Sequence, residues 1–437
     1  MMRVLDLRGS DRSLAGLLSS VPRASNDLSS ALDVASNLIA DVVDRGEAAL
    51  RDQATKFDGG APESFRVSES EMSRALAELD PRVRDGLEEA IARVRKVSQA
   101  QVPPSSLTTL GPGAVVEQRW VPVSRVGLYV PGGKAVYPSS VVMNVVPAQV
   151  AGVSSIALVS PPQREFGFAV HPTVLAAAAL LGIDEVYAMG GAGAVGALAH
   201  GVPSIGLDPV DVITGPGNIF VAAAKRLVRG IVGIDSEAGP TEILIIADES
   251  ADADLVAADL ISQAEHDSLA AAVLVTDSVD LADAVQERVR VRAAGTSHAE
   301  RVAEALDGPQ SATILVDDLA HAVALSNAYA PEHLEVHVTD TEAILPQLTN
   351  AGAIFVGNDA PVSLGDYVAG SNHVLPTLGQ ARFSSALGAY TFLRAQQVIR
   401  YDAEGLATVA HHVRALSDAE NLPAHGDAVD ARTEGED

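Results

Sequence analysis

The feature that most constrains the fold is an alternation of short apolar segments with helical segments across residues 129–356. In residues 129–239, apolar runs such as Ser155–Ser160 and Glu185–Met189 are each followed by an alanine-rich stretch with helical spacing. A second run of the same kind covers residues 242–356. This alternation is typical of a parallel sheet with helices on its faces. The sequence therefore predicts an α/β protein with two such domains.

The flanking segments are expected to be helical or short strands. Residues 26–57 place apolar side chains at three- and four-residue spacing, which predicts an amphipathic helix, and residues 71–99 predict a second. Strands are expected at residues 115–123 and 125–130, which have turn residues around them. The part after about Gly379 is expected to be mainly helical, with a polar, frayed end over the last dozen residues.

Composition excludes several classes of function. The chain of 437 residues has no cysteine, which removes disulfides, thiolate metal sites and cysteine nucleophiles. Asp and Glu total 57 against 30 Lys and Arg, a formal charge of −27, and such an acidic surface repels nucleic acid. No apolar run is long enough to span a membrane, and the N-terminus lacks an apolar signal core. We therefore expect a cytoplasmic protein.

Three glycine-rich turns follow expected strands in the first α/β run: Pro131–Lys134, Gly191–Gly196 and Thr214–Asn218. Such turns present backbone N–H groups to anions. Three of them at strand ends indicate a ligand crevice along the carboxyl ends of the strands. Gly191–Gly196 also fits the G-x-G-x-x-G pattern of dinucleotide sites. The alternative for this motif is tight packing of a helix on a strand.

Polar residues that could carry chemistry gather in the second half. Gln263 and His266 are three residues apart at an expected helix end, so they share one face. Glu332 and His333 place an acid beside a base in front of an expected strand. Taken singly, each pair also has a plain explanation as a helix cap or a polar loop. Further residues of this kind are Asp366, His373, Glu420 and His425.

Together these pieces resemble the histidinol dehydrogenase family. The matching motifs stand in the family's order: Val126–Gly133, Gly215–Asn218, Ala238–Glu242, Ser262–His266, Pro331–Leu334, Gly365–Tyr367 and Asn372–Pro376. The resemblance implies two incomplete Rossmann-like domains, with parallel sheets flanked by helices, plus small helical N- and C-terminal pieces. The implied division is an N-terminal segment 1–24, a first α/β domain 25–128 and 241–380 with the metal and catalytic residues, a second α/β domain 129–240 with the NAD-binding loops, and a helical segment 381–437 that reaches the partner subunit.

The resemblance also implies an activity. The family oxidises L-histidinol to L-histidine via L-histidinal, the final step of L-histidine biosynthesis, with two NAD as co-substrate and one zinc per subunit. It acts as a homodimer with shared active sites. The chain has no cysteine for a thiohemiacetal, so the aldehyde step would need a base-activated water.

Residue roles follow from the same resemblance. The implied zinc ligands are Gln263, His266, Asp366 and His425, whose nitrogen and oxygen donors suit zinc. Glu332 and His333 become the acid–base pair. The implied substrate contacts are Thr241, His373 and Glu420, together with His333 and the four metal ligands. The implied NAD contacts are Tyr129, Gly193 and Asn218, although the family commonly carries Gln where this chain has Gly193.

Two other functions remain open. One is a different NAD-dependent zinc alcohol dehydrogenase of this fold, acting on another amino alcohol or a sulfonate. The other is a regulator that keeps the fold without the activity. His373 and Glu420 favour histidinol over the first, and the presence of all four candidate ligands favours catalysis over the second.

Overall fold

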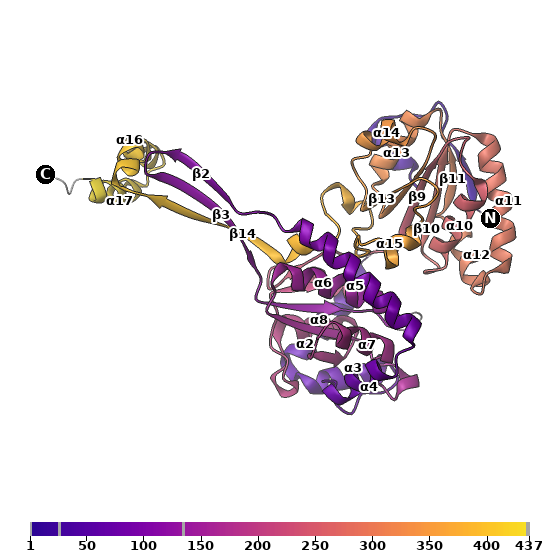
Figure 1. The fold of residues 1–437 in the computed structure, drawn as a ribbon, viewed down its shortest axis with the longest axis horizontal. Coiled ribbons are helices and arrows are strands. Elements are labelled where there is room, and N and C mark those ends of the chain that lie inside the picture. The colour runs from indigo at the N-terminus through magenta and orange to yellow at the C-terminus, as the bar shows by residue number, and fades with distance from the viewer. Residues whose placement is uncertain (1, 25–27, 133–135, 434–437) are drawn as a thin grey trace.

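The computed structural model describes residues 2–24, 28–132 and 136–433, so part of the predicted turn Pro131–Lys134 lies outside the described residues. These residues form two α/β units and an elongated arm, which projects from the units and carries the C-terminus (Figure 1). Each α/β unit is built on a parallel sheet flanked by helices, which confirms the predicted fold class.

The first unit contains a five-stranded parallel sheet in the order β6-β5-β4-β7-β8. Its strands are β4 (Arg125–Tyr129), β5 (Ser155–Ser160), β6 (Val186–Ala188), β7 (Val212–Thr214) and β8 (Gly233–Ile234). The intervening helices are α6 (Pro138–Ala151), α7 (Pro172–Leu180), α8 (Gly191–His200) and α9 (Ile219–Val228). The chain moves outward from β4 to β6 and then returns to the other side of β4 with β7. This reversal creates a crevice at the carboxyl ends of β4 and β7, where open α/β sheets bind ligands.

Four helices from the N-terminal quarter pack on this same unit: α2 (Ser29–Arg45), α3 (Glu47–Phe57), α4 (Glu69–Ala77) and α5 (Pro81–Gln101). Helix α2 lies against α8 and α9, α4 lies against α7, and α5 lies against α6. The structure therefore differs from the expected grouping of residues 25–128 with residues 241–380. The reason is that the apolar stripes of these helices are buried with the core of the five-stranded sheet, of which β4 is the central strand.

The two long helices expected in this region are each interrupted. Gly46 separates α2 from α3 with a φ of 55°, a left-handed conformation that glycine adopts readily. Asp80 and Pro81 separate α4 from α5, because the Asp80 side chain caps a new helix whose first residue is proline.

The second unit contains a six-stranded parallel sheet in the order β1-β11-β10-β9-β12-β13. Its strands are β1 (Arg3–Asp6), β9 (Glu242–Ala247), β10 (Ala271–Thr276), β11 (Ala312–Leu315), β12 (His333–His337) and β13 (Ala353–Val356). Its helices are α1 (Leu14–Ser20), α10 (Ala253–Ala264), α11 (Val279–Gly295), α12 (Ala299–Asp307), α13 (Leu319–Tyr329), α14 (Thr341–Ile344) and α15 (Val362–Tyr367). The N-terminal segment is thus part of this unit, since β1 pairs with β11 as an edge strand.

The arm combines segments far apart in the sequence. Strands β2 (Ser106–Gly111), β3 (Ala114–Pro122) and β14 (Leu393–Tyr401) form an antiparallel sheet, and helices α16 (Ala403–Ala419) and α17 (Pro423–Thr433) lie at its tip (Figure 1). This corrects two expectations. The segment 381–437 contains a nine-residue strand, because β3 offers it a hydrogen-bonding edge. Helix α17 also extends through most of the C-terminal stretch that was expected to fray.

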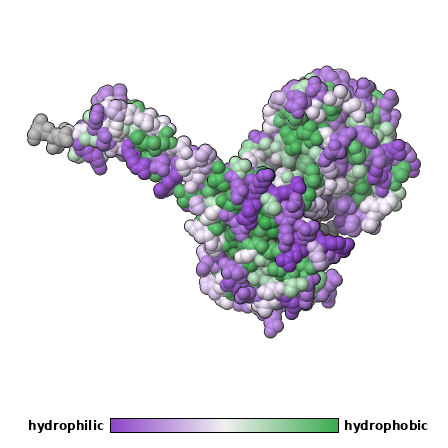
Figure 2. Space-filling model, viewed as in Figure 1, coloured by the Kyte–Doolittle hydropathy of each residue, from purple (hydrophilic) through white to green (hydrophobic). Residues whose placement is uncertain are grey.

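The surface of the arm is partly apolar (Figure 2). Leu107, Leu110, Ile399 and Leu416 are 61–66% exposed. Apolar side chains gathered on a projecting element are typical of a surface that another protein covers.

Short 3₁₀ turns complete the chain: η1 (Arg164–Phe166), η2 (Pro203–Ile205), η3 (Leu345–Gln347), η4 (Gln380–Arg382) and η5 (Ala389–Phe392). Within the described ranges, no helix is both long enough and apolar enough to cross a bilayer.

Candidate active site

Seven of the residues singled out in the sequence meet at the amino ends of β9 and β12, two neighbouring strands of the six-stranded sheet. Two of them precede these strands directly, and two others lie at or just beyond the C-terminal end of α10. The rest come from β12, from α15 and from the loop after α15. The seven are Thr241, Gln263, His266, Glu332, His333, Asp366 and His373.

This edge of the six-stranded sheet faces the first unit. The hydroxyl of Ser140, in the first turn of α6, lies 3.0 Å from Nε2 of His373. The side-chain amide of Asn372 donates to the Met143 carbonyl of the same helix at 2.6 Å. Because α6 follows β4, these contacts join the carboxyl edge of the five-stranded sheet to the amino edge of the six-stranded sheet. The site therefore lies between the two α/β units.

A chain of hydrogen bonds connects the acid to the end of α10. Thr241 Oγ1 donates to Glu332 Oε2 at 2.6 Å, and Gln263 Nε2 donates to Thr241 Oγ1 at 2.8 Å. The backbone N–H of Glu242 donates to the same Glu332 oxygen at 2.9 Å. The Thr241 hydroxyl and the Glu242 N–H thus hold the Glu332 carboxyl group in one orientation at the amino ends of β9 and β12.

Two of the three histidines of the site, His333 and His373, have a defined tautomer. His333 Nδ1 lies 3.1 Å from the carbonyl oxygen of Glu242, and His373 Nδ1 lies 2.9 Å from that of Asp366. A carbonyl only accepts, so each Nδ1 carries the proton and each Nε2 is left as a basic nitrogen. The His333 Nε2 is therefore the atom that can take a proton from a substrate.

Burial controls the protonation of this group. Loss of solvent raises the pKa of Glu332 to about 7, against the lowering effect of its bonds from Thr241 and Glu242. Burial lowers the pKa of His333 and of His373, with Asp366 acting in the opposite direction on both. Near neutral pH, His333 and His373 are thus neutral imidazoles beside a Glu332 carboxyl group that can gain or lose a proton, a combination that suits acid–base catalysis.

Two of the four predicted metal ligands, His266 and Asp366, lie close together, and Gln263 is connected to the same site through Thr241. His266 Nε2 and Asp366 Oδ2 are 3.9 Å apart, a separation that two donors at about 2.0–2.2 Å from one ion can have. Gln263 Oε1 is buried and accepts no hydrogen bond from any part of the chain that the structure describes. A buried acceptor without a donor is costly unless a ligand occupies it. The chemistry of these donors, nitrogen and oxygen without sulfur, fits zinc.

The other two residues predicted to bind metal or substrate lie elsewhere. Glu420 ends α16 and His425 lies in α17, both at the tip of the arm and away from the two α/β units (Figure 1). One chain therefore places three of the four predicted ligands in the same site, and the fourth is carried on the arm.

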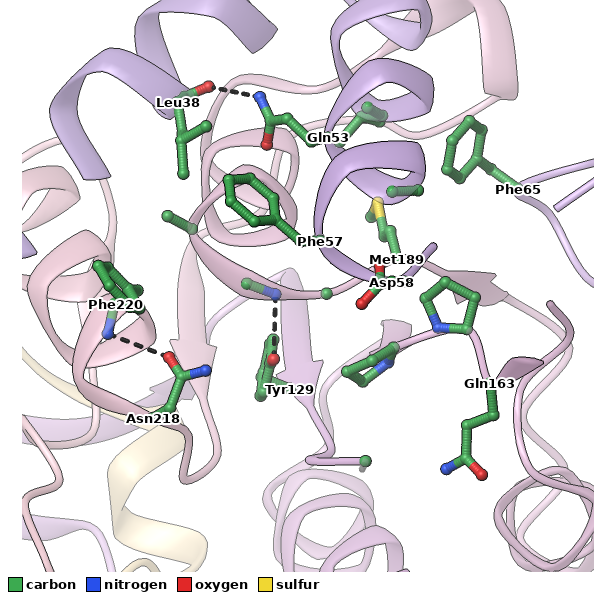
Figure 3. Close-up of a pocket in the computed structure, with 18 of the residues that line it drawn as sticks. Leu38, Gln53, Phe57, Asp58, Phe65, Tyr129, Gln163, Met189, Asn218 and Phe220 are labelled. Atoms are coloured by element: carbon green, nitrogen blue, oxygen red, sulfur yellow. Dashed lines mark hydrogen bonds between the residues drawn. The ribbon is translucent and has the colours of Figure 1, made fainter. Parts of the chain in front are cut away.

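A separate cavity of about 580 Å³ opens at the carboxyl ends of β4, β5, β6 and β7 (Figure 3). Tyr129 and Asn218, two of the predicted cofactor contacts, line it. The Tyr129 hydroxyl accepts the Gly191 N–H at 3.1 Å, so its own proton remains free to donate. Asn218 Oδ1 accepts the Phe220 and Val221 N–H groups as the cap of α9, which leaves its amide N–H₂ as a donor. The cavity agrees with the predicted crevice at the strand ends.

Gly193 has a packing role in α8. A Cβ atom at this position would lie 2.1 Å from Gln53 Oε1, and one at Gly196 would lie 3.2 Å from Ile39. The motif also follows β6, the third strand of the unit along the chain, whereas the phosphate turn of a dinucleotide fold follows the first. For Gly193 and Gly196 the structure thus favours the packing interpretation over the nucleotide fingerprint.

A buried ion pair supports the turn Gly215–Asn218 through hydrogen bonds to Gly215. Lys225 pairs with Asp235, and the two side chains are 1% and 5% exposed. Lys225 Nζ also donates to the Gly215 carbonyl at 3.0 Å, while Asp235 Oδ2 accepts the Gly215 N–H at 2.8 Å. Gly215 itself has a φ of 114° and lies so close to the chain that a Cβ would be 2.0 Å from the Tyr129 carbonyl oxygen. Neither Lys225 nor Asp235 was predicted from the sequence to support this turn.

A second group of potential metal donors was also missed. Asp259 of α10 and Glu335 and His337 of β12 place ligand atoms within 4.8 Å of one another. Glu335 Oε2 lies 3.3 Å from His337 Nε2, and Glu335 Oε1 accepts the N–H of Val362 at the start of α15. The signal in the sequence is the alternation of His333, Glu335 and His337 along an otherwise apolar strand, which places all three on one face. This group connects the three elements that carry the candidate site.

Comparisons with known proteins agree with these observations. Residues 21–433 match the family model described as histidinol dehydrogenase. A histidinol dehydrogenase of Leifsonia xyli subsp. xyli is 66% identical over 99% of each chain, and one of Nocardia farcinica is 58% identical over 98% of this chain and 97% of the relative. A solved histidinol dehydrogenase from Elizabethkingia anophelis superposes with a TM-score of 0.93 at 31% identity, over 99% of this chain and 98% of that one. The chain therefore belongs to the histidinol dehydrogenase family of oxidoreductases.

Proposed function

We propose that this protein oxidises L-histidinol to L-histidine via L-histidinal, with two NAD as co-substrate, as the final step of L-histidine biosynthesis in the cytoplasm. One observation carries the proposal: in a member of this family, a buried acid and a neutral histidine with a free Nε2 stand in one site with three nitrogen and oxygen donors. An alcohol oxidation followed by an aldehyde oxidation needs both of these bases.

Zinc would be held by Gln263, His266 and Asp366, with His425 of the partner subunit as the fourth ligand. When bound, zinc supplies a Lewis acid that polarises and orients a substrate heteroatom. The unpartnered Gln263 Oε1 supports this assignment, because an ion would satisfy it.

In the first oxidation, His333 Nε2 takes the hydroxyl proton while the carbinol carbon loses a hydride to NAD, which leaves the aldehyde and NADH. The hydrogen bond from His333 Nδ1 to the Glu242 carbonyl supports this role, since it fixes the ring and keeps Nε2 unprotonated. The lowered pKa of His333 keeps the ring neutral before the reaction.

In the second oxidation, Glu332 takes a proton from a water molecule that adds to the aldehyde. The resulting hydrate loses a hydride to a second NAD, and His333 again accepts the hydroxyl proton. Burial raises the pKa of Glu332 to about 7, which makes its carboxylate a better base than an exposed one. Thr241 holds the carboxyl group in place, and Thr241 and His373 stand where they can contact the substrate.

A homodimer with shared sites explains the position of the arm. Glu420 and His425 lie on its tip, away from the donors of their own chain, and its apolar side chains are exposed. In a dimer, each arm would cover apolar surface and bring Glu420 and His425 to the site of the partner. NAD would occupy the cavity lined by Tyr129 and Asn218.

The test is the stoichiometry of the reaction. With excess NAD, purified protein should form two NADH for each L-histidinol consumed, and L-histidine should be the product. One NADH per substrate, with the aldehyde or another amino alcohol as the better substrate, would favour a different dehydrogenase of this fold. No turnover of any amino alcohol by metal-loaded protein would favour a regulator.

A further inference from the structure

The carboxyl end of β5 lacks an acidic residue. In dinucleotide-binding folds, a carboxylate at the end of the second strand binds the ribose hydroxyls and disfavours a 2′-phosphate. Strand β5 holds that position here, next to β4, but the chain after Ser160 continues as Pro161, Pro162 and Gln163. The first acid beyond them is Glu165, which is exposed at the rim of the cavity beside Arg164.

An acid reaches the cavity from another element. Asp58 directly follows α3, where its backbone N–H donates to the Ala54 carbonyl at 2.9 Å and ends the helix. Its carboxylate points into the cavity near the start of α8 (Figure 3). Burial alone raises the pKa of Asp58 to about 6, and no group in the described ranges donates a hydrogen bond to this carboxylate. It is therefore an acceptor that faces the cavity without a donor.

Gln53 also lines the cavity and adds a second acceptor near Asp58. Gln53, also on α3, donates its Nε2 to the Leu38 carbonyl at 3.1 Å, so its Oε1 is left as an acceptor. The space into which Gln53 reaches exists because Gly193 has no side chain. A ribose diol offers two hydroxyl donors that match these two acceptors, whereas a phosphate offers further negative charge. Arg164, the cation among the lining residues, is exposed on η1 rather than beside Asp58.

We propose that Asp58 binds the adenosine ribose hydroxyls of the dinucleotide and makes the enzyme select NAD over NADP. Helix α3 thus supplies the carboxylate that the sheet does not. The inference rests on the proposed use of NAD and adds to it the residue that sets coenzyme specificity.

The experiment compares Asp58→Asn with wild type and with Glu165→Gln, which removes the same charge from the rim of the same cavity. Dissociation constants for NAD and for NADP are measured by calorimetry without substrate, and kcat/KM is measured for both coenzymes. Asp58→Asn should weaken NAD binding by about 10-fold and shift the NAD-to-NADP preference toward NADP by at least about 10-fold, as expected for loss of hydrogen bonds to a charged group. Glu165→Gln should leave the preference within about twofold. Asp58→Ser repeats the test if the Asn variant unfolds.

The outcomes separate the inference from the proposed function. An unchanged preference in both Asp58 variants, with NAD still bound, would overturn the role of Asp58 and leave NAD use intact. An equal shift of the NAD-to-NADP preference in Glu165→Gln would also overturn it. The preference would then reflect the overall negative charge near the cavity and not a contact made by Asp58. If the wild-type protein preferred NADP, the inference would be wrong, and Arg164 would be the residue expected to bind the 2′-phosphate. A wild type that binds neither coenzyme would remove the proposed function itself.

Discussion

Thr241 donates its hydroxyl proton to Glu332 across 2.6 Å, and this bond joins the residues that precede two neighbouring strands, β9 and β12. The same hydroxyl oxygen accepts from Gln263 at the end of α10. One side chain thus links the candidate base to a candidate metal ligand. Because both strands are fully buried and in fixed register, the geometry of this pair is set by the core of the six-stranded sheet.

Glu332→Gln should separate the two half-reactions. Gln keeps the size of the side chain and can still accept the Thr241 bond, but it cannot take a proton from water. Oxidation of L-histidinal should fall by about 10²–10⁴-fold, while oxidation of L-histidinol to the aldehyde should fall less. His333→Asn is the comparison and should impair both steps. Single-turnover NADH formation from L-histidinol and from L-histidinal measures the rate of each step. Equal losses in both steps for Glu332→Gln would show that Glu332 and His333 do not have separate roles.

The aldehyde step should lose rate at acidic pH. The pKa of Glu332 is raised to about 7, so its carboxylate, the basic form, predominates above about pH 7 and is protonated below it. The rate of L-histidinal oxidation should therefore rise with pH through this range, and the rise should be absent in Glu332→Gln. The same raised pKa makes ionisation of Glu332 unfavourable for folding, so its contribution to stability is present below its ordinary pKa of 4.5 and is lost as the pH rises through 7. Pre-steady-state rates across pH 5.5–8.5 would test the prediction.

His266→Ala should release the metal. Removal of one imidazole leaves Gln263 and Asp366 as weak oxygen ligands, so both bound zinc and turnover should be lost. His337→Gln is the matched control, because His337 belongs to the other group of donors, with Asp259 and Glu335. Metal content by mass spectrometry after dialysis should fall for His266→Ala alone. A loss of metal in His337→Gln with retention in His266→Ala would place the ion at the second group.

Two inactive variants should complement each other. His266→Ala damages the site on the α/β units, and His425→Ala damages the arm. If the arm serves the partner subunit, a mixed dimer contains one intact site, and activity should return to a fraction of wild type after subunit exchange. Exchange is verified separately with differently tagged chains. Proven exchange without recovery would mean that each chain completes its own site.

Lys225→Met should destabilise the five-stranded unit. Lys225 and Asp235 are both almost fully buried, so removal of the cation leaves an uncompensated carboxylate. The free energy of unfolding should fall by about 3–5 kcal/mol. Lys225→Met combined with Asp235→Asn should recover part of this loss, since Asn is neutral and can still accept the Gly215 N–H. Urea denaturation of the three proteins measures the effect, and NAD binding should weaken in the single variant because the turn before Asn218 loses its support.

Much of the architecture could be predicted from the chain alone. Strand β5 has the predicted bounds, Ser155–Ser160, because its apolar residues form one short run between serines, and most of the strand is buried. The motifs around Gln263, Glu332 and Asp366 were also visible, since polar residues stand out beside apolar strands and helices. Local sequence could therefore determine the type of each element and the presence of reactive side chains near its end.

The tertiary structure decided how these pieces combine. Helices α2 to α5 pack on the five-stranded sheet because their apolar stripes fit α6 to α9, a match between surfaces that periodicity does not reveal. Strand β14 forms because β3, distant in sequence, offers it an edge. Asp58 reaches the cavity only because α3 ends beside α8, so no spacing rule places it near Tyr129. Local sequence determines whether a segment prefers to be a helix or a strand. Burial and hydrogen bonding between segments distant in sequence decide which helices and strands pack together and which of their ends form a site.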